Sequence, residues 1–200
     1  MIFSGGDSTD QDFCVALEHE FLRCHEAFQL FAAVAPHLIG QDSDRRLAYR
    51  AFSAYSDFIH HFYEFMLGAY CRERNNTGLT KKKGSCLQTD TYINHHAQRV
   101  MTIKRDAIKN GTAPSWENAL STYPETIDPL FAVKLRKIRN SATGHVDPER
   151  AKVELTTFYH EHHMVLYWLY RDCIRQWGPK DGAFPDWQAI TNFSVNVPAA

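Results

Sequence analysis

The stretch Phe131-Ala-Val-Lys-Leu-Arg-Lys-Ile-Arg-Asn-Ser-Ala-Thr-Gly-His-Val-Asp-Pro148 decides the predicted fold of this 200-residue chain. Apolar residues recur at helical spacing as far as Ala142, and Gly144 can take the left-handed conformation that ends a helix. Asp147 and Pro148 then provide a cap and a proline at the first helical position. The stretch therefore predicts the end of one helix, a tight turn and the start of the next.

The same signals of helical spacing and cap residues recur on both sides of this stretch. The expected helices cover, in chain order, residues 8–34, 45–74, 89–109, 126–143 and 148–177. There are no repeats and no convincing strands, so we predict an all-α, up-and-down antiparallel bundle of about five helices. The bundle is expected to span residues 1–177, with a basic loop insertion at about 75–88. Residues 178–200 contain three prolines and two glycines. We expect them to form an irregular C-terminal tail that packs on the body or on a partner.

Composition predicts a soluble, cytoplasmic protein. Hydrophobic residues make up 44% and charged residues 22% of the chain, as in ordinary globular domains. No apolar run approaches the roughly 18 residues that a membrane span needs, and the N-terminus does not resemble a secretory signal. The five cysteines are widely spaced, without a Cys-x-x-Cys pair. Small buried thiols in a reducing compartment are the expected outcome.

Charge is distributed unevenly along the chain. Residues 1–44 carry eight acidic residues against one arginine, a net charge of −7, whereas residues 72–109 carry nine basic residues against three acidic ones, a net charge of +6. Such a region can attract phosphates or meet an acidic partner, and it can equally be a solvated surface. Its lysine run, Lys81, Lys82 and Lys83, could hold an RNA backbone or keep a loop soluble.

Eleven histidines raise the question of a metal site. Helical metal sites commonly use His-x-x-x-His or Glu-x-x-His spacings, and neither occurs in this chain. His162 falls on the apolar stripe of the last helix, where a hydrogen-bonded core histidine is expected. Glycine-rich phosphate loops are absent too. We therefore expect neither a metal nor a cofactor, although ligands from separate helices remain an alternative.

The polar residues at the central junction are Arg139, Asn140 and His145. An all-α chain with an arginine, a polar residue directly after it and a histidine four to six residues later resembles the HEPN (higher eukaryotes and prokaryotes nucleotide-binding) family. The family motif lies at the end of one helix and the start of the next. The resemblance covers the helical body, about residues 8–177, and its specific content is these three residues.

By that resemblance, the chain is expected to be a metal-independent endoribonuclease that acts as a homodimer, with the motifs of two subunits facing one another in a shared cleft. The implied products are a 2′,3′-cyclic phosphate and a 5′-hydroxyl. The family's frequent settings are toxin–antitoxin modules, phage defence and RNA processing. RNA is therefore the expected substrate, and an antitoxin or another defence protein is a possible partner.

The chemistry of the three residues fits this reaction. Histidine exchanges protons near neutrality, so His145 could act as base or acid when the 2′-hydroxyl attacks the phosphate. Arg139 can grip two phosphate oxygens through its planar fork, and Asn140 can orient the histidine or the phosphate. Lys134 and Lys137 are further candidates for RNA contacts. Tyr55, His60 and His61 could approach the cleft, but no catalytic role is predicted for them.

Structural roles are the alternative at each position. Arg139 could bond the last carbonyls of a helix, Asn140 could be a surface residue, and His145 could be a turn residue beside a cap. In that case the chain is a catalytically inactive helical module that binds nucleotide, RNA or a protein partner through residues 72–109. A histidine-rich metalloenzyme is the third reading.

Overall fold

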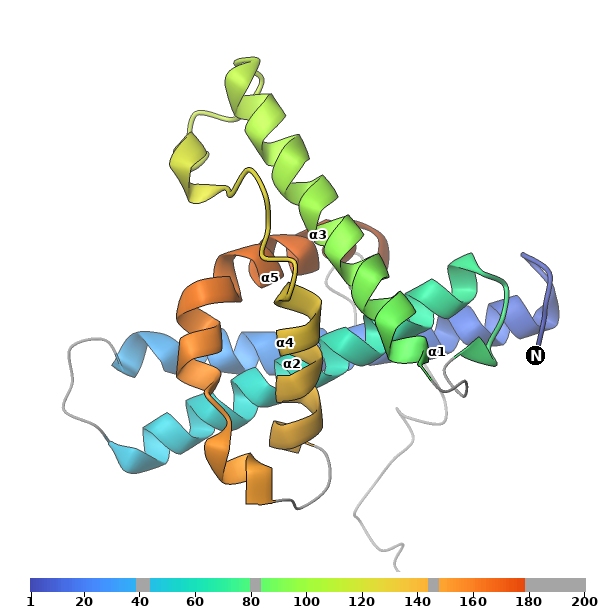
Figure 1. Ribbon diagram of the computed structural model, residues 1–200, viewed down its shortest axis with the longest axis horizontal. Helices are drawn as coiled ribbons and strands as arrows, with labels where there is room; N and C mark the ends of the chain where they lie inside the picture. The colour runs from blue at the N-terminus through green and yellow to red at the C-terminus, as the bar shows by residue number, and fades with distance from the viewer. Residues whose placement is uncertain (39–43, 80–83, 144–147, 179–200) are drawn as a thin grey trace, which may run out of the picture.

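The computed structural model describes residues 1–38, 44–79, 84–143 and 148–178 (Figure 1). Its five α-helices are α1 (Ser8–Val34), α2 (Arg45–Glu73), α3 (Ser85–Lys109), α4 (Phe131–Ile138) and α5 (Leu155–Trp177). Short helical turns lie between them: η1 (Ala35–Leu38), η3 (Leu120–Thr122), η4 (Arg139–Thr143) and η5 (Pro148–Lys152). Within the described ranges there is no strand, and the predicted all-α helical bundle is confirmed.

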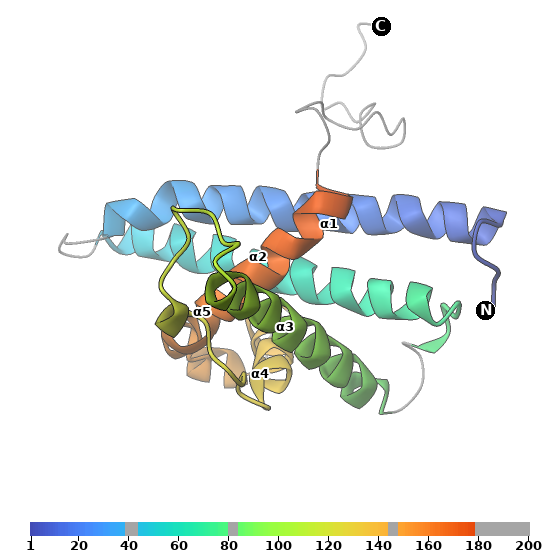
Figure 2. The same cartoon turned by 90° about the horizontal axis from the view of Figure 1, so that it is seen from above.

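Helices α1 and α2 form a long antiparallel pair along the molecule, and both begin where the sequence predicted (Figure 2). The Asp7 carboxylate accepts a hydrogen bond from the Asp10 amide at 2.8 Å. The Asp44 carboxylate accepts from the amides of Arg46 at 2.9 Å and Leu47 at 3.3 Å. These bonds satisfy amides that have no partner inside the helix.

Aromatic side chains fill the space where α5 crosses the α1–α2 pair. Tyr170 of α5 is fully buried, with its ring 5.8 Å from that of Phe21 and 5.3 Å from that of Phe58. Its hydroxyl lies 2.7 Å from His25 Nδ1, so its one polar atom is paired. Burying a phenylalanine contributes roughly 1.5–3 kcal/mol, which makes this cluster a large part of the stability.

A buried ion pair fixes α4 against α3. Asp90 of α3 is only 4% exposed, and Arg136 of α4 contacts its Oδ2 through Nε at 3.0 Å and through Nη2 at 2.9 Å. The Tyr63 hydroxyl of α2 also donates to Asp90, at 3.4 Å. A buried carboxylate needs such partners. Because Arg136 precedes η4 by three residues, this pair also helps to position the junction.

Helix α3 begins at Ser85, four residues before the predicted start at Thr89, so part of the expected loop is helical. Gly84, with φ of +85°, turns the chain into the helix. Thr89 is not a cap. Its side chain is buried and its hydroxyl donates to the Ser85 carbonyl one turn earlier, at 3.2 Å.

Two other predicted helix starts were wrong. Helix α4 begins at Phe131 rather than near Thr126, because Pro129 disfavours a helical Asp128 and the Asp128 carboxylate caps the Leu130 amide at 2.8 Å. Pro148 opens only the turn η5, and α5 begins at Leu155 because Glu154, with φ of −88° and ψ of 60°, interrupts the helix. The predicted roles of Gly144, Asp147 and the tail 179–200 lie outside the described residues.

None of the described helices is long and apolar enough to cross a membrane. None of the five cysteines forms a disulfide; Cys24 and Cys71 are buried as expected, whereas Cys14, Cys86 and Cys173 are half-buried.

Candidate functional site

The junction after α4 is a single π-helical turn, η4, that carries Arg139 and Asn140. The Thr143 hydroxyl closes the turn by donating to the Arg139 carbonyl at 2.8 Å. Single π-turns at helix ends are uncommon and are found often at functional sites. The turn packs against α2.

The Arg139 guanidinium is held between its own turn and α2. Nη2 pairs with the Glu64 carboxylate, and Nη1 donates to Asn140 Oδ1 at 2.8 Å. The guanidinium carbon also lies 5.8 Å from the centre of the Tyr63 ring, at cation–π distance. The Arg139 side chain is 32% exposed, so it stays in reach of a ligand.

Asn140 is exposed, and the contact that its side chain makes is with Arg139. It thus orients the arginine, whereas the sequence suggested that it would orient a histidine or a phosphate. His145 lies outside the described residues, so the predicted trio is placed only in part.

His60 of α2 joins this cluster. Its Nδ1 lies 2.8 Å from the Thr143 hydroxyl, which ties the histidine to the same turn as Arg139. Burial lowers the pKa of His60, and the neighbouring His61 and Arg139 lower it further. Glu64 and Glu20 oppose this effect without reversing it. These surroundings therefore favour the neutral imidazole of His60.

The next residue, His61, belongs to a different contact. Its Nδ1 lies 2.7 Å from Glu20 Oε1 of α1. Together the two histidines connect the acidic first helix to η4 through α2. Tyr55, the third residue expected near the cleft, instead contacts His163 Nδ1 at 3.0 Å in the core.

A pocket of about 400 Å³ lies where α1, α2 and η4 meet. Its apolar wall comes from α1 and from Gly68 of α2. Its polar and charged lining consists of Glu20, Arg23, His60, Glu64 and Arg139. Two guanidinium groups, an imidazole and two carboxylates thus face one small space, a combination suited to binding an anion and moving a proton.

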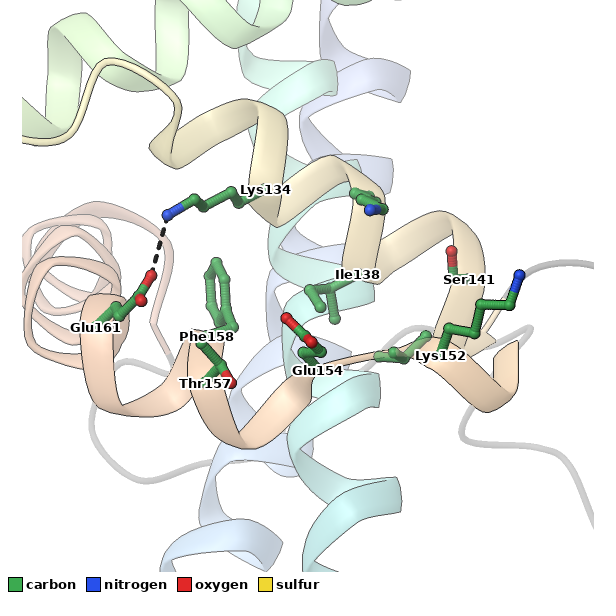
Figure 3. Close-up of a pocket in the computed structure, with 10 residues that line it drawn as sticks. Lys134, Ile138, Ser141, Lys152, Glu154, Thr157, Phe158 and Glu161 are labelled. Carbon is green, nitrogen blue, oxygen red and sulfur yellow. Dashed lines mark hydrogen bonds and ion pairs between the residues drawn. The ribbon is translucent and has the colours of Figure 1, made fainter. Parts of the chain in front are cut away.

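A second pocket, of about 440 Å³, lies between α4, η4, η5 and the start of α5 (Figure 3). Ile138 and Phe158 form its apolar wall, and the charged residues around it are Lys134, Lys137, Lys152, Glu154 and Glu161. Ser141 of η4 belongs to this lining, so the same turn borders both pockets.

The predicted RNA-contacting lysines differ in their surroundings. Lys134 pairs with Glu161 at 3.0 Å (Figure 3). It also pairs with Asp128 at 3.0 Å and donates to His162 Nε2 at 3.1 Å. Lys137 is exposed on the same helix. Lys81, Lys82 and Lys83 lie outside the described residues. His162 is 5% exposed and hydrogen-bonded, as predicted for a core histidine.

Basic residues of region 72–109 are largely paired within the chain. Arg72 contacts Asp10 at 2.8 Å, Arg99 contacts Asp172 at 2.6 Å and Lys104 contacts Glu117 at 2.6 Å. In the described part of this region, most basic side chains therefore form ion pairs with acidic residues of the same chain. This lowers the charge that remains for an RNA backbone.

Among the described residues, no group of three or more histidine, cysteine, aspartate or glutamate side chains is placed to hold a metal ion. Sequence reasoning did not include Thr143, and it considered His60 with Glu64 only as a disfavoured metal-ligand pair, without giving either a role beside Arg139. The available signal was the i, i+4 spacing of His60 and Glu64, which puts both on one face of α2. Nothing local showed that this face meets the Arg139 turn.

Comparisons of the chain with known protein families, with curated proteins and with solved structures find no match.

Proposed function

We propose that this protein is a metal-independent endoribonuclease of the HEPN type. It cleaves RNA by attack of a 2′-hydroxyl on the adjacent phosphate, which leaves a 2′,3′-cyclic phosphate and a 5′-hydroxyl. The observation that carries the proposal is the turn η4, which presents Arg139 to a pocket that also holds the neutral imidazole of His60.

Phosphate binding is the task of Arg139. A guanidinium offers two parallel N–H donors to phosphate oxygens and stabilises the charge that develops on the pentacoordinate phosphorane. Asn140 holds one edge of the guanidinium through its Oδ1 atom. A preoriented cation loses less entropy when the substrate binds and is therefore more effective.

Glu64 occupies the position at Nη2 that a phosphate oxygen would take. The pair is partly exposed, with 32% of the Arg139 and 28% of the Glu64 side chain accessible. Ion pairs at such exposure contribute about 0.2–1 kcal/mol. A doubly coordinated phosphate, with charge-assisted hydrogen bonds of about 1.5–3 kcal/mol each, can displace the carboxylate.

His145 completes the site in this proposal. It follows η4 by two residues, and a homodimer in which two such turns face one another would bring two copies to one cleft. Proton transfer to the leaving 5′-oxygen is then the role of His145. An RNA-cleaving effector of toxin or phage-defence type, held in check by an antitoxin or another defence protein, is the biological setting that we propose.

The test is RNA cleavage by purified protein in the presence of a chelator. Arg139→Ala and His145→Ala are each expected to lower the rate at least 100-fold, because each removes charge stabilisation or proton transfer. Arg171→Ala, at an exposed position of α5, is the matched control and should cleave like the wild type. Wild-type rates in both site variants would refute the proposal.

The second candidate function is a catalytically inactive module of the same fold that binds nucleotide, RNA or a protein partner. The observation that favours it is the pocket with Ile138 and Phe158 in its wall, where three lysines outnumber two glutamates and so suit a flat, negatively charged ligand. RNA or nucleotide binding that survives Arg139→Ala, falls in Lys137→Ala and is accompanied by no cleavage would support this function over the first.

A further inference from the structure

We propose that His60 is a catalytic residue, the base that accepts the 2′-hydroxyl proton in the same subunit whose Arg139 holds the phosphate. This inference rests on the proposed ribonuclease function and assigns a role within it. Two observations carry it, the hydrogen bonds of Thr143 and the pocket that His60 shares with Arg139, and the lowered pKa of His60 supports it.

Thr143 fixes the tautomer of His60. A threonine hydroxyl has one proton, and the Thr143 hydroxyl donates it to the Arg139 carbonyl at 2.8 Å. The 2.8 Å contact between that oxygen and His60 Nδ1 therefore requires the ring to donate. A neutral imidazole has one N–H, so Nδ1 carries it and Nε2 carries a lone pair.

No hydrogen bond to Nε2 competes for this lone pair among the described residues. His60 is held from one side by Thr143 and lines the 400 Å³ pocket. General-base histidines have this arrangement: one ring nitrogen is unprotonated, and a hydrogen bond at the other ring nitrogen fixes the ring.

Several charged groups surround His60. Glu20 approaches from α1, His61 and Glu64 lie on α2, and Arg139 comes from η4. Burial has the largest effect, and it lowers the pKa below the ordinary value of 6.5. A base with such a pKa is ready to accept a proton throughout the neutral range, at some loss of basicity.

The step balances within the site. His60 Nε2 takes the proton of the 2′-hydroxyl, and the 2′-oxygen forms a bond to phosphorus while Arg139 stabilises the phosphorane. The bond from phosphorus to the 5′-oxygen then breaks, and that oxygen leaves with a proton from the general acid of the proposed function. The cyclic phosphate and the 5′-hydroxyl are the products, and one base and one acid suffice.

The rival role for His60 is purely structural, as an anchor for η4 through Thr143. His60→Asn separates the two roles, because the asparagine amide can still donate to Thr143 from the Nδ1 position but offers nothing at Nε2. His95→Asn is the matched control, since His95 is exposed on α3. The wild type and both variants are compared for kcat and KM on one RNA in the presence of chelator, and for unfolding in urea.

We expect His60→Asn to lower kcat at least 100-fold with KM and the urea midpoint nearly unchanged, and His95→Asn to behave as the wild type. In the wild type, kcat/KM should fall at acid pH with a midpoint below 6.5. This fall should be absent in His60→Asn. Nitrogen-15 spectra of the histidines should show His60 protonated at Nδ1 and not at Nε2.

Failure of this inference is distinguishable from failure of the proposed function. The role of His60 would be overturned if His60→Asn cleaved RNA with the kcat of the wild type, or if the nitrogen-15 spectrum showed a proton on Nε2. Either result would leave the ribonuclease proposal intact. A wild-type protein that cleaves no RNA would overturn both.

Discussion

Single residues around η4 determine whether the Arg139 guanidinium is available. Glu64 is the one acidic partner that the structure gives it in the described residues, and Asn140 is its neutral partner. In the ribonuclease that we propose, the carboxylate keeps the cation in position in the free protein and yields when a phosphate binds. Glu64 therefore restrains binding and preorganises the site at the same time.

Removing only the charge of Glu64 separates these two effects. Glu64→Gln keeps the side-chain shape but weakens the pair, so we expect RNA to bind several-fold more tightly. Titration with an RNA that carries 2′-deoxy sugars and cannot be cleaved measures the affinity directly. Glu18→Gln, at an exposed position of α1, is the control. Weaker binding in Glu64→Gln would show that the carboxylate helps to bind RNA.

A different histidine controls stability at acid pH. Burial among the rings of Phe31, Tyr55, Tyr159 and Tyr167 lowers the pKa of His163 to about 4. The unfolded chain takes up a proton at this residue near pH 6.5, whereas the folded protein does so only near pH 4. Between these values the unfolded state binds more protons, so the free energy of unfolding falls as the pH falls.

The expected loss from His163 is about 3 kcal/mol between pH 6.5 and pH 4. His163→Asn should show a correspondingly shallower decline when urea unfolding is measured at pH 7, 6, 5 and 4. His95→Asn should decline as the wild type does. An identical decline in His163→Asn and the wild type would mean that His163 is protonated in the folded protein.

Among the helices, the sequence correctly predicted the starts that are determined by local signals. The predicted starts of α1 and α2 were confirmed, with Asp7 and Asp44 as caps, because a short polar side chain before an apolar stripe acts only on its own helix. The starts of α4 and α5 were wrong. Pro129 and Asp128 shift the start of α4 to a later residue. The backbone conformation at Glu154 does the same for α5, although Pro148 is a favourable residue for a helix start.

The pairing of α4 with α3 is the element contact on which the junction depends. Asp90→Ala leaves Arg136 without its bidentate partner in a largely buried position, where only 25% of its side chain is exposed. We expect a loss of about 3 kcal/mol in the free energy of unfolding, measured in urea. Asp172→Ala breaks pairs with Arg99 and Arg175, whose side chains are 45% and 77% exposed, and should cost less than about 1 kcal/mol. Equal losses would contradict the structural role of the Asp90–Arg136 pair.

At the scale of the whole molecule, the all-α bundle could be predicted because helical periodicity is local and repeated along the chain. The candidate site could be predicted only in part. Arg139 and Asn140 are adjacent in sequence, so the motif found them, but Glu64 and His60 reach the site from a helix about 75 residues away. Only the packing of η4 on α2 brings them together.

Analysis of the ends of RNA cleaved in the presence of chelator tests the ribonuclease assignment most directly. Total cellular RNA is incubated with the purified protein, and the new ends are identified once a cut site is mapped. We predict 2′,3′-cyclic phosphate and 5′-hydroxyl ends, and no cleavage when the sugar at the cut site lacks its 2′-hydroxyl. The absence of cleavage, ends with a 5′-phosphate, or cleavage at a 2′-deoxy sugar would contradict the assignment.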